Sequence, residues 1–163
     1  PVPVIAALEG FCFGAGMQLA LAADIRIAHP DTQMSIMKSR WGLVPDMGLS
    51  RSLKGVIGLD LAKELTLTAR IFDANYAKQI GLVTHLSETP LQQAQALAEE
   101  MLQRSPDALA AAKQVLDAME HQPRKSLRLE KIWQLKLLLG KNSQLARKKD
   151  KQPEVQFVPR QFQ

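Results

Sequence analysis

The sequence predicts an α/β fold in which a core of short strands and helices is followed by a helical region. Three observations lead to this prediction. Residues 4–28 show a strand, a glycine-bearing turn, a helix and a second strand in succession. Short apolar runs then alternate with helical segments up to residue 86, and from there to about residue 140 the pattern is helical alone. A chain of 163 residues is long enough to bury a sizeable core.

The first strand is predicted over Val4–Leu8, and the β-branched run Ile25–Ile27 is the second. Between them, Gly14-Ala15-Gly16 opens a helix rich in alanine and leucine. A helix start leaves its first N–H groups without intrahelical acceptors, and glycines let another molecule approach the backbone. The turn therefore suits a phosphate or a developing oxyanion; the alternative is a tight turn with small residues for close packing.

Further elements are expected in order up to residue 86. Asp73 is a good helix N-cap, and Gly81 occupies the place of the glycine that follows a helix end. The predicted elements are a strand over 34–37, a loop over 43–48, helices over 49–54, 59–68 and 74–80, and a strand over 82–86.

The rest of the chain is predicted to be helical. Thr89-Pro90 and Ser105-Pro106 each place proline at the first position of a helix. A third helix is expected over Lys125–Leu139, with candidate apolar contacts at Leu127, Ile132, Leu135 and Leu139. From Gln152 onward we expect an extended or loosely ordered segment. The chain is therefore divided into a core over 1–86, a helical region over 87–140 and a basic polar tail over 141–163.

Charge and hydropathy narrow the function classes. The net charge is +5, and basic residues gather late in the chain, up to the run Arg147–Lys151. Such a tail suits an acidic surface or a phosphate-rich ligand, or it is a solvated helix face. Aromatic residues do not interleave with it, so no nucleic-acid partner is expected. No apolar run approaches the ~20 residues of a membrane span, so no membrane partner is expected either.

The cysteine and histidine content argues against disulfides and metals. Cys12 is the one cysteine, which excludes an intrachain disulfide and fits a reducing, cytoplasmic location. It lies between two phenylalanines, so we expect a core residue rather than a nucleophile. His29, His85 and His121 lack metal-ligand spacing, and no metal site is expected.

Several segments together resemble the enoyl-CoA hydratase/isomerase (crotonase) superfamily. The similarity runs in order from residue 3 to about residue 86, and the helical remainder is compatible with the family but less specific. The segments that carry it are Pro3–Gly10, Phe13–Ala20, Asp24–Ala28, Gly42–Gly48, Leu61–Arg70 and Asp73–Val83.

The resemblance implies a spiral core of ββα units, of which this chain holds the C-terminal part, followed by a C-terminal helical trimerisation region. In the family, an N-terminal portion of the core supplies most contacts to coenzyme A and one of two oxyanion-hole amides. We expect the chain to lack that portion. The implied substrate is an acyl-CoA thioester with no cofactor beyond its own coenzyme A, and the implied assembly is a homotrimer or a dimer of trimers.

The resemblance also assigns site residues. The second oxyanion amide falls on Ala15, between Gly14 and Gly16. The two glutamates of the family's hydratases fall on Gln18 and Lys38. Glutamine is no base at neutral pH, and lysine becomes one only when strongly desolvated. Two-glutamate hydration is therefore not expected, and Gly14, Gly16, Gln18 and Lys38 are assigned to substrate binding.

Asp46 remains as the candidate base. By resemblance it matches an acidic residue of dienoyl-CoA isomerases and the nucleophilic aspartate of 4-chlorobenzoyl-CoA dehalogenase. One carboxylate suffices for a 1,3-proton shift, so we predict an enoyl-CoA or dienoyl-CoA isomerase-like enzyme. The alternatives are a hydrolase or dehalogenase that uses Asp46, and a non-catalytic CoA-binding relative. Locally, Asp46 also suits a plain turn residue after proline.

In the family, basic and aromatic residues of the C-terminal helices approach the nucleotide end of coenzyme A. This resemblance makes Lys131, Trp133 and Lys136 candidate contacts to coenzyme A.

Overall fold

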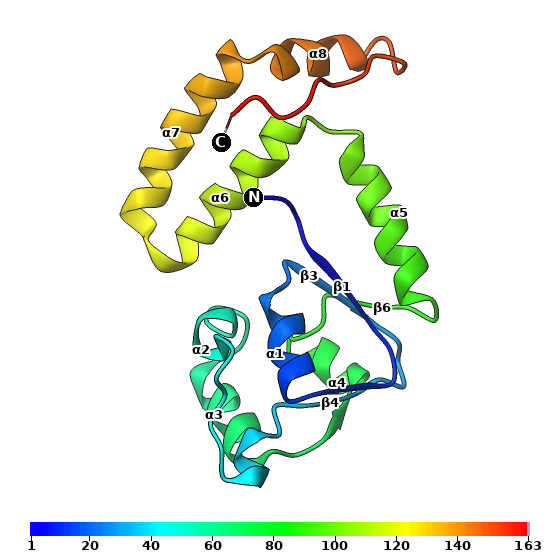
Figure 1. Ribbon diagram of the computed structural model, residues 1–163, viewed down its shortest axis with the longest axis vertical. Coiled ribbons are helices and arrows are strands. Elements are labelled where there is room, and N and C mark those ends of the chain that lie inside the picture. Colours follow the sequence, from blue (N-terminus) through cyan, green and yellow to red (C-terminus); the bar gives the residue numbers. More distant parts are fainter. Residues whose placement is uncertain (163) are drawn as a thin grey trace. The chain divides into compact units, whose positions relative to one another are not determined.

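The computed structural model describes residues 1–162, without the side chains of residues 120, 121 and 123. The side chain of His121 therefore lies outside the described residues. The chain divides into two compact units (Figure 1). We name Val4–Ala96 the core unit, and Pro1–Pro3 with Leu97–Gln163 the helical unit.

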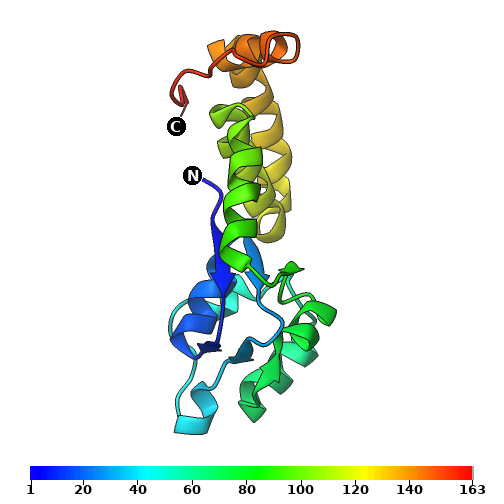
Figure 2. The same ribbon diagram turned by 90° about the vertical axis from the view of Figure 1, so that its right-hand side faces the viewer.

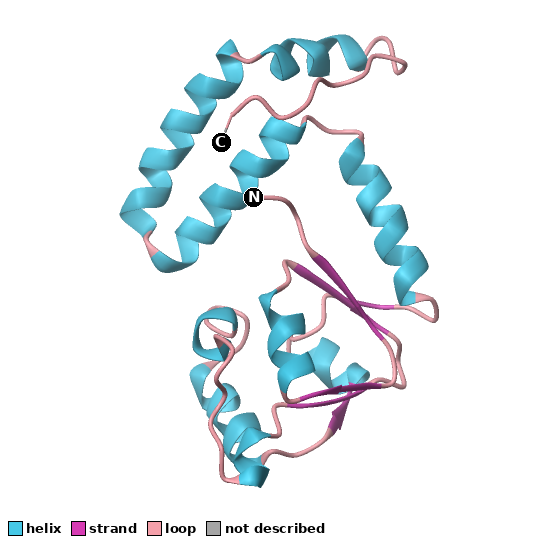
Figure 3. Ribbon diagram, viewed as in Figure 1, coloured by secondary structure: helices cyan, strands magenta, loops and turns pink. Residues whose placement is uncertain are grey.

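The core unit is a spiral of strands that alternate between two sheets. The strands β1 (Ile5–Leu8) and β3 (Ile25–Ala28) pair in parallel in one sheet, and β2 (Phe11–Phe13) and β4 (Gln33–Ser35) pair in parallel in the other. In the described chain the sheet orders are β1-β3-β6 and β2-β4-β5. Figure 3 shows the strands of the core unit in magenta. The helix α1 (Ala15–Ala22) connects β2 to β3, so each turn of the spiral begins with a ββα unit.

The remaining elements of the core unit follow the predicted order. The helix over 59–68 has its predicted bounds, a short 3-10 helix and a two-residue strand were not predicted, and the others are shorter than predicted. The remaining elements are η1 (Lys38–Trp41), α2 (Leu49–Ser52), α3 (Leu59–Thr68), β5 (Phe72–Asp73), α4 (Ala74–Gln79) and β6 (His85–Leu86). The predicted N-cap is confirmed, because the Asp73 carboxylate accepts from the Tyr76 N–H at 2.7 Å. Gly81 has φ +86°, as a glycine after a helix end often does.

The predicted strand over 82–86 is confirmed only at its end. The Val83 N–H donates to the Ala77 carbonyl instead of to a strand, and Leu82 and Val83 are buried in the core. The same core contains Met17, Met34 and Leu65, none of which is exposed. Residues of α1, β4 and α3 thus share one buried cluster.

Cys12 lies in this core, as predicted, with 6% of its surface exposed. Burial disfavours the charged thiolate and raises the pKa of the Cys12 thiol to about 11. A thiol in this state is a poor nucleophile at neutral pH.

The helical unit is built from helices joined by short turns. The helix α5 (Pro90–Leu102) leads into it, followed by α6 (Pro106–His121), α7 (Pro123–Leu139) and α8 (Lys141–Lys149). In both views α6 and α7 lie side by side as an antiparallel pair (Figures 1 and 2). Ser105 caps α6 by accepting from the Ala108 N–H at 3.3 Å, with Pro106 at the first position as predicted. No helix of the described chain is long and apolar enough to cross a membrane.

The polar tail expected over 141–163 contains a helix and a hydrogen-bonded segment that were not predicted. Asp107 and Asn142 are each 1% exposed, and the Asn142 amide donates to the Asp107 carboxylate at 2.7 Å. The Asp107 carboxylate also accepts from the backbone N–H groups of Gln161 and Phe162, at 2.7 and 3.1 Å. Asn142 exchanges two further hydrogen bonds with the backbone of Val158. The last residues are thus anchored, which corrects the expectation of loose order.

The candidate apolar contacts of α7 are exposed within this chain. Its buried side is formed around Trp133, whose indole N–H donates to the Gln114 side chain at 2.9 Å. The opposite side carries large apolar residues that are between 40% and 76% exposed: Leu127, Ile132, Leu135, Leu138 and Leu139. These five residues form the apolar face of α7.

Candidate active site

The turn that opens α1 presents backbone N–H groups to open space. Gly14 has φ +53° and its own N–H donates to the Ser35 carbonyl at 2.9 Å, which fixes the turn on β4. The next amide is that of Ala15, the first residue of α1, and it has no acceptor within the helix. Ala15 and Gly16 are exposed, and a Cβ added at Gly16 would meet no atom within 4 Å. The exposure of these two residues suits the approach of an oxyanion to the helix start.

Lys38 lies at the start of a strained turn. The preceding residue, Met37, has φ +59°, a conformation that costs energy for a residue with a side chain. The Lys38 N–H donates to the Ile36 carbonyl at 2.8 Å, and the Ser39 hydroxyl donates to the Thr66 carbonyl of α3. These bonds hold the turn in place and fix where the Lys38 side chain begins. Strain of this kind often occurs at functional sites.

Asp46 forms an ion pair with Lys38. The Lys38 Nζ lies 2.8 Å from the Asp46 Oδ1, and the two side chains are 19% and 63% exposed. The hydrogen bond and the charge of Lys38 lower the pKa of Asp46 from its ordinary value of 3.8. Asp46 is therefore an ionised carboxylate at neutral pH, able to accept a proton or to attack an electrophile.

Gln18 reaches the same loop from α1. Its side chain is fully buried, and its Oε1 accepts from the Met47 N–H at 2.9 Å. Its Nε2 is buried without a hydrogen-bond partner among the described residues. The amide also lowers the pKa of Asp46, as the last of the causes after Lys38. Gln18, Lys38 and Asp46, which are far apart in sequence, are thus brought together.

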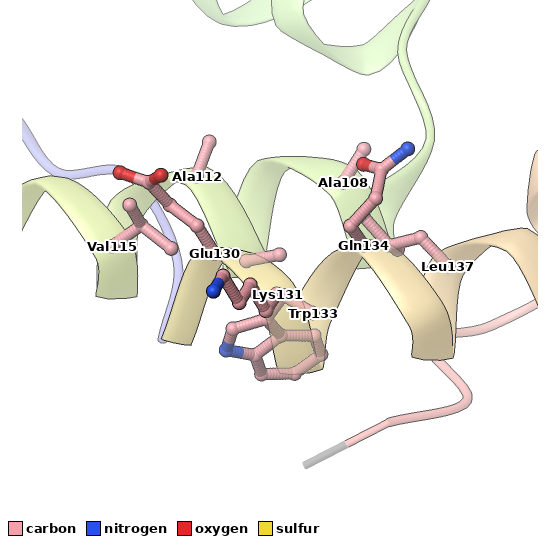
Figure 4. A pocket seen from close by; sticks show the side chains of 9 residues that line it. Ala108, Ala112, Val115, Glu130, Lys131, Trp133, Gln134 and Leu137 are labelled. Atoms are coloured by element: carbon pink, nitrogen blue, oxygen red, sulfur yellow. The ribbon is translucent and has the colours of Figure 1, made fainter. Parts of the chain in front are cut away.

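The second group of predicted residues lies on α7. Lys131, Trp133 and Gln134 line an open hollow of about 550 Å³ between α6 and α7 (Figure 4). The Trp133 indole is 4% exposed, and the Lys136 Nζ lies 4.8 Å from the centre of its ring. The indole is thus largely committed to packing within α6 and α7. Contact of Lys131, Trp133 or Lys136 with coenzyme A stays a prediction.

Two features of the site were missed by sequence analysis. The backbone N–H of Met47, which holds the loop to Gln18, gives no signal in the sequence, because any residue except proline could supply it. Met37 is missed because positive φ is expected mainly at glycine and asparagine. Among the described residues, no group of three or more His, Cys, Asp or Glu side chains is placed to hold a metal ion.

The site combines an exposed amide at a helix start with one ionised carboxylate. The amide can stabilise negative charge on a carbonyl oxygen, and the carboxylate can take up a proton. The two positions that the resemblance matches to hydratase glutamates, Gln18 and Lys38, hold a neutral amide and an ammonium group.

Comparison with known proteins shows the family to which the chain belongs. Residues 1–149 match the family described as enoyl-CoA hydratase/isomerase. The mitochondrial methylglutaconyl-CoA hydratase of Mus musculus is 39% identical over 119 residues, which cover 69% of this chain and 38% of that protein. The mitochondrial Delta(3,5)-Delta(2,4)-dienoyl-CoA isomerase of Dictyostelium discoideum is 32% identical over 118 residues, which cover 71% and 40%. The chain spans about two fifths of the length of these relatives.

Solved structures show the same fold. An enoyl-CoA hydratase from Mycobacterium tuberculosis is 29% identical, with a TM-score of 0.87 over 96% of this chain and 64% of that one. An enoyl-CoA hydratase from a Polaromonas species is 29% identical, with a TM-score of 0.86 over 96% and 62%. The α/β spiral described above is thus a crotonase-like fold. The chain belongs to the enoyl-CoA hydratase/isomerase (crotonase) superfamily.

Proposed function

We propose that this chain carries the proton-transfer site of an enoyl-CoA or dienoyl-CoA isomerase-like enzyme that acts on an acyl-CoA thioester. The observation that carries the proposal is the acid–base content of the site. Asp46 is an ionised carboxylate beside Lys38, while Gln18 offers no basic group. A single carboxylate that takes up a proton and returns it is what a double-bond shift requires.

In this mechanism Asp46 removes a proton from the carbon next to the thioester carbonyl of a 3-enoyl chain. The C–H electron pair forms a new carbon–carbon double bond, and the carbonyl π electrons move onto the oxygen. The Ala15 N–H donates to that oxygen and stabilises its charge. The protonated Asp46 then returns the proton to the γ-carbon, the carbonyl re-forms, and the double bond is conjugated with it. No atom is gained or lost overall.

Hydration is disfavoured for this site because water must be both positioned and deprotonated during addition across the double bond. The family's hydratases use two glutamates for this purpose, and the matching residues here are Gln18 and Lys38. The named relatives include both a hydratase and a dienoyl-CoA isomerase, so family membership alone is compatible with either activity.

A hydrolase or dehalogenase is the second candidate function. The observation that favours it is the exposure of Asp46, because an ionised carboxylate that is 63% exposed can attack an acyl or aryl carbon directly. A covalent adduct on Asp46, detected by mass spectrometry after incubation with an aroyl-CoA, would support this function over proton transfer. Acyl-CoA binding without turnover on any thioester would support a non-catalytic CoA-binding protein instead.

The test compares three thioesters with the full-length natural protein. We expect 3-enoyl-CoA or 3,5-dienoyl-CoA to be converted to an isomer of unchanged mass, and 2-enoyl-CoA to gain water slowly or not at all. Mass spectrometry and the absorbance of the conjugated product distinguish the two reactions. Rapid hydration of 2-enoyl-CoA without isomerisation of the other two would contradict the proposal.

We also propose that copies of the protein associate through α7, as the family resemblance implies for a homotrimer or a dimer of trimers. The support is the apolar face of α7, since five large apolar residues are exposed together on one helix. A cytoplasmic location stays a prediction from the single cysteine, and the two curated relatives named above are mitochondrial.

A further inference from the structure

Gln18 is the buried polar side chain that the mechanism leaves without a role. Its surface is fully buried, yet hydrogen bonding satisfies only its oxygen, and its Nε2 has no partner among the described residues. A buried donor without an acceptor destabilises the folded state. A leucine or methionine would fill the same space without this cost, so the amide calls for an explanation.

The loop that carries Asp46 depends on side chains for its position. The loop joins η1 to α2, and most of its residues are exposed. Val44, Asp46 and Met47 are 76%, 63% and 43% exposed, so packing contacts contribute little to fixing their positions. Two contacts reach the loop at its centre: the ion pair of Lys38 with Asp46, and the hydrogen bond from the Met47 N–H to Gln18.

The Gln18 amide holds this loop through its oxygen. The Oε1 accepts from the backbone one residue after Asp46, at 2.9 Å, which places the amide group beside the residue that carries the base. The Nε2 is buried there without a partner among the described residues. Lys38 is the charged residue paired with Asp46, and Arg40 of the same turn lies instead 5.9 Å from the Trp41 ring.

An amide suits this position because its hydrogen bond to the loop stays the same whether the Asp46 carboxyl group is ionised or protonated. The attraction of Lys38 for Asp46 weakens once the carboxylate has taken up a proton and lost its charge. Glutamine itself neither takes up nor releases a proton. A glutamate in its place would compete with Asp46 for the proton.

We propose that Gln18 is a positioning residue for Asp46: its Oε1 fixes the loop through the Met47 N–H, and its neutral amide lies beside the base without competing with it for the proton. This inference rests on the proposed function of Asp46. It assigns Gln18 to the positioning of the base, whereas the resemblance assigned it to substrate binding.

Two variants separate the two parts of this role. Gln18→Glu keeps an oxygen for the Met47 N–H but replaces the neutral amide with a second carboxyl group. Gln18→Met has similar size and removes the hydrogen bond to the loop. Gln92→Glu introduces the same charge at an exposed position of α5 and is the matched control. All are measured in the full-length natural protein.

In Gln18→Glu, two neighbouring carboxyl groups repel as anions, so the pair takes up its first proton at higher pH than Asp46 does in the wild type. We expect the acid limb of the kcat/KM profile to move to higher pH, together with the Asp46 carboxyl titration followed by ¹³C NMR. In Gln18→Met, we expect kcat to fall about 10- to 100-fold with little change in KM, because the loop is released. The control should match the wild type in each measurement.

An unchanged Asp46 titration and acid limb in a folded Gln18→Glu variant would overturn the proposal, as would full kcat in Gln18→Met. A role in packing alone would lower the stability of both variants without moving either titration. The NMR titration needs no turnover. If Asp46 proves not to be the base, the titration still decides whether Gln18 acts on it.

Discussion

At the scale of single residues, Lys38 makes Asp46 a weak base that is ionised at rest. Its lowered pKa keeps the carboxylate ionised through the neutral range, and activity should fall only as the pH drops below the ordinary carboxyl value of 3.8. A weak base needs an acidic C–H bond, and the C–H bond beside a thioester becomes acidic only if the enolate oxygen is stabilised. The Ala15 amide therefore has to carry much of the catalytic effect.

The substitution Ala15→Val tests this dependence. A β-branched side chain beside the amide crowds the oxyanion, and loss of one such donor raises a barrier by about 3 kcal/mol, or 100-fold or more in kcat. The folded state should lose only about 0.5 kcal/mol, since Ala15 is an exposed first residue of α1. Leu19→Val, at a 61% exposed position of the same helix, is the control. Full turnover in Ala15→Val would remove this amide from the mechanism.

Cys12 is predicted to be chemically silent in the folded protein. Its thiol is buried and its pKa is raised to about 11, so almost no thiolate is present at pH 7.5. Because the described chain has one cysteine, a thiol reagent reports on this residue alone. We expect labelling at least ~100-fold slower in buffer than in denaturant. Labelling at the denatured rate under native conditions would show that Cys12 is not in the core.

At the scale of elements, the C-terminal segment depends on one buried carboxylate. Asp107 accepts from Asn142, Gln161 and Phe162, and its removal leaves buried donors without acceptors. We expect Asp107→Ala to lower the free energy of unfolding by about 2–3 kcal/mol, measured with urea, and to expose residues 155–162 to hydrogen exchange. Asp117→Ala, at an exposed position of α6, should change neither. Equal stability of the two variants would mean that the segment is held by other contacts.

The sequence predicted the elements whose signals are local. The Asp73 cap, the Gly81 helix end and the proline at the start of α6 were all found, because each depends on residues within a few positions of one another. The strand β2 was missed because three residues, Phe11–Phe13, carry no periodicity of their own and become a strand only by pairing with β4. The Asp107–Asn142 hydrogen bond joins residues that are 35 positions apart, and no local sequence pattern predicts that they pair.

The candidate site also combines features that could be predicted from the sequence with features that could not. The exposed amide at Ala15 could be predicted from a glycine-bearing helix start, and the nearness of Gln18, Lys38 and Asp46 followed from the resemblance. The geometry that decides their chemistry could not be predicted. The Lys38–Asp46 ion pair and the Gln18–Met47 hydrogen bond each depend on how a loop returns to the turn before it.

At the scale of the whole molecule, the apolar face of α7 is the feature that the single chain leaves unexplained. If it is the contact between copies, Leu135→Glu should place a charge in that contact and lower the assembly state in sedimentation velocity. Leu67→Glu, at a 73% exposed position of α3, should leave the assembly unchanged. A monomeric wild-type protein, or an assembly unaffected by Leu135→Glu, would contradict the proposed trimer. Either result would indicate that other segments of the protein pack on the apolar face of α7.

The central claim is that Asp46 moves the proton, and one substitution tests it most directly. Asp46→Asn keeps the size of the side chain and removes its basicity. In the full-length natural protein, we predict that kcat for 3-enoyl-CoA isomerisation falls at least ~100-fold while acyl-CoA binding is retained. Asp31→Asn, a 92% exposed aspartate outside the site, should keep the wild-type rate. Equal rates for Asp46→Asn and the wild type would contradict the account.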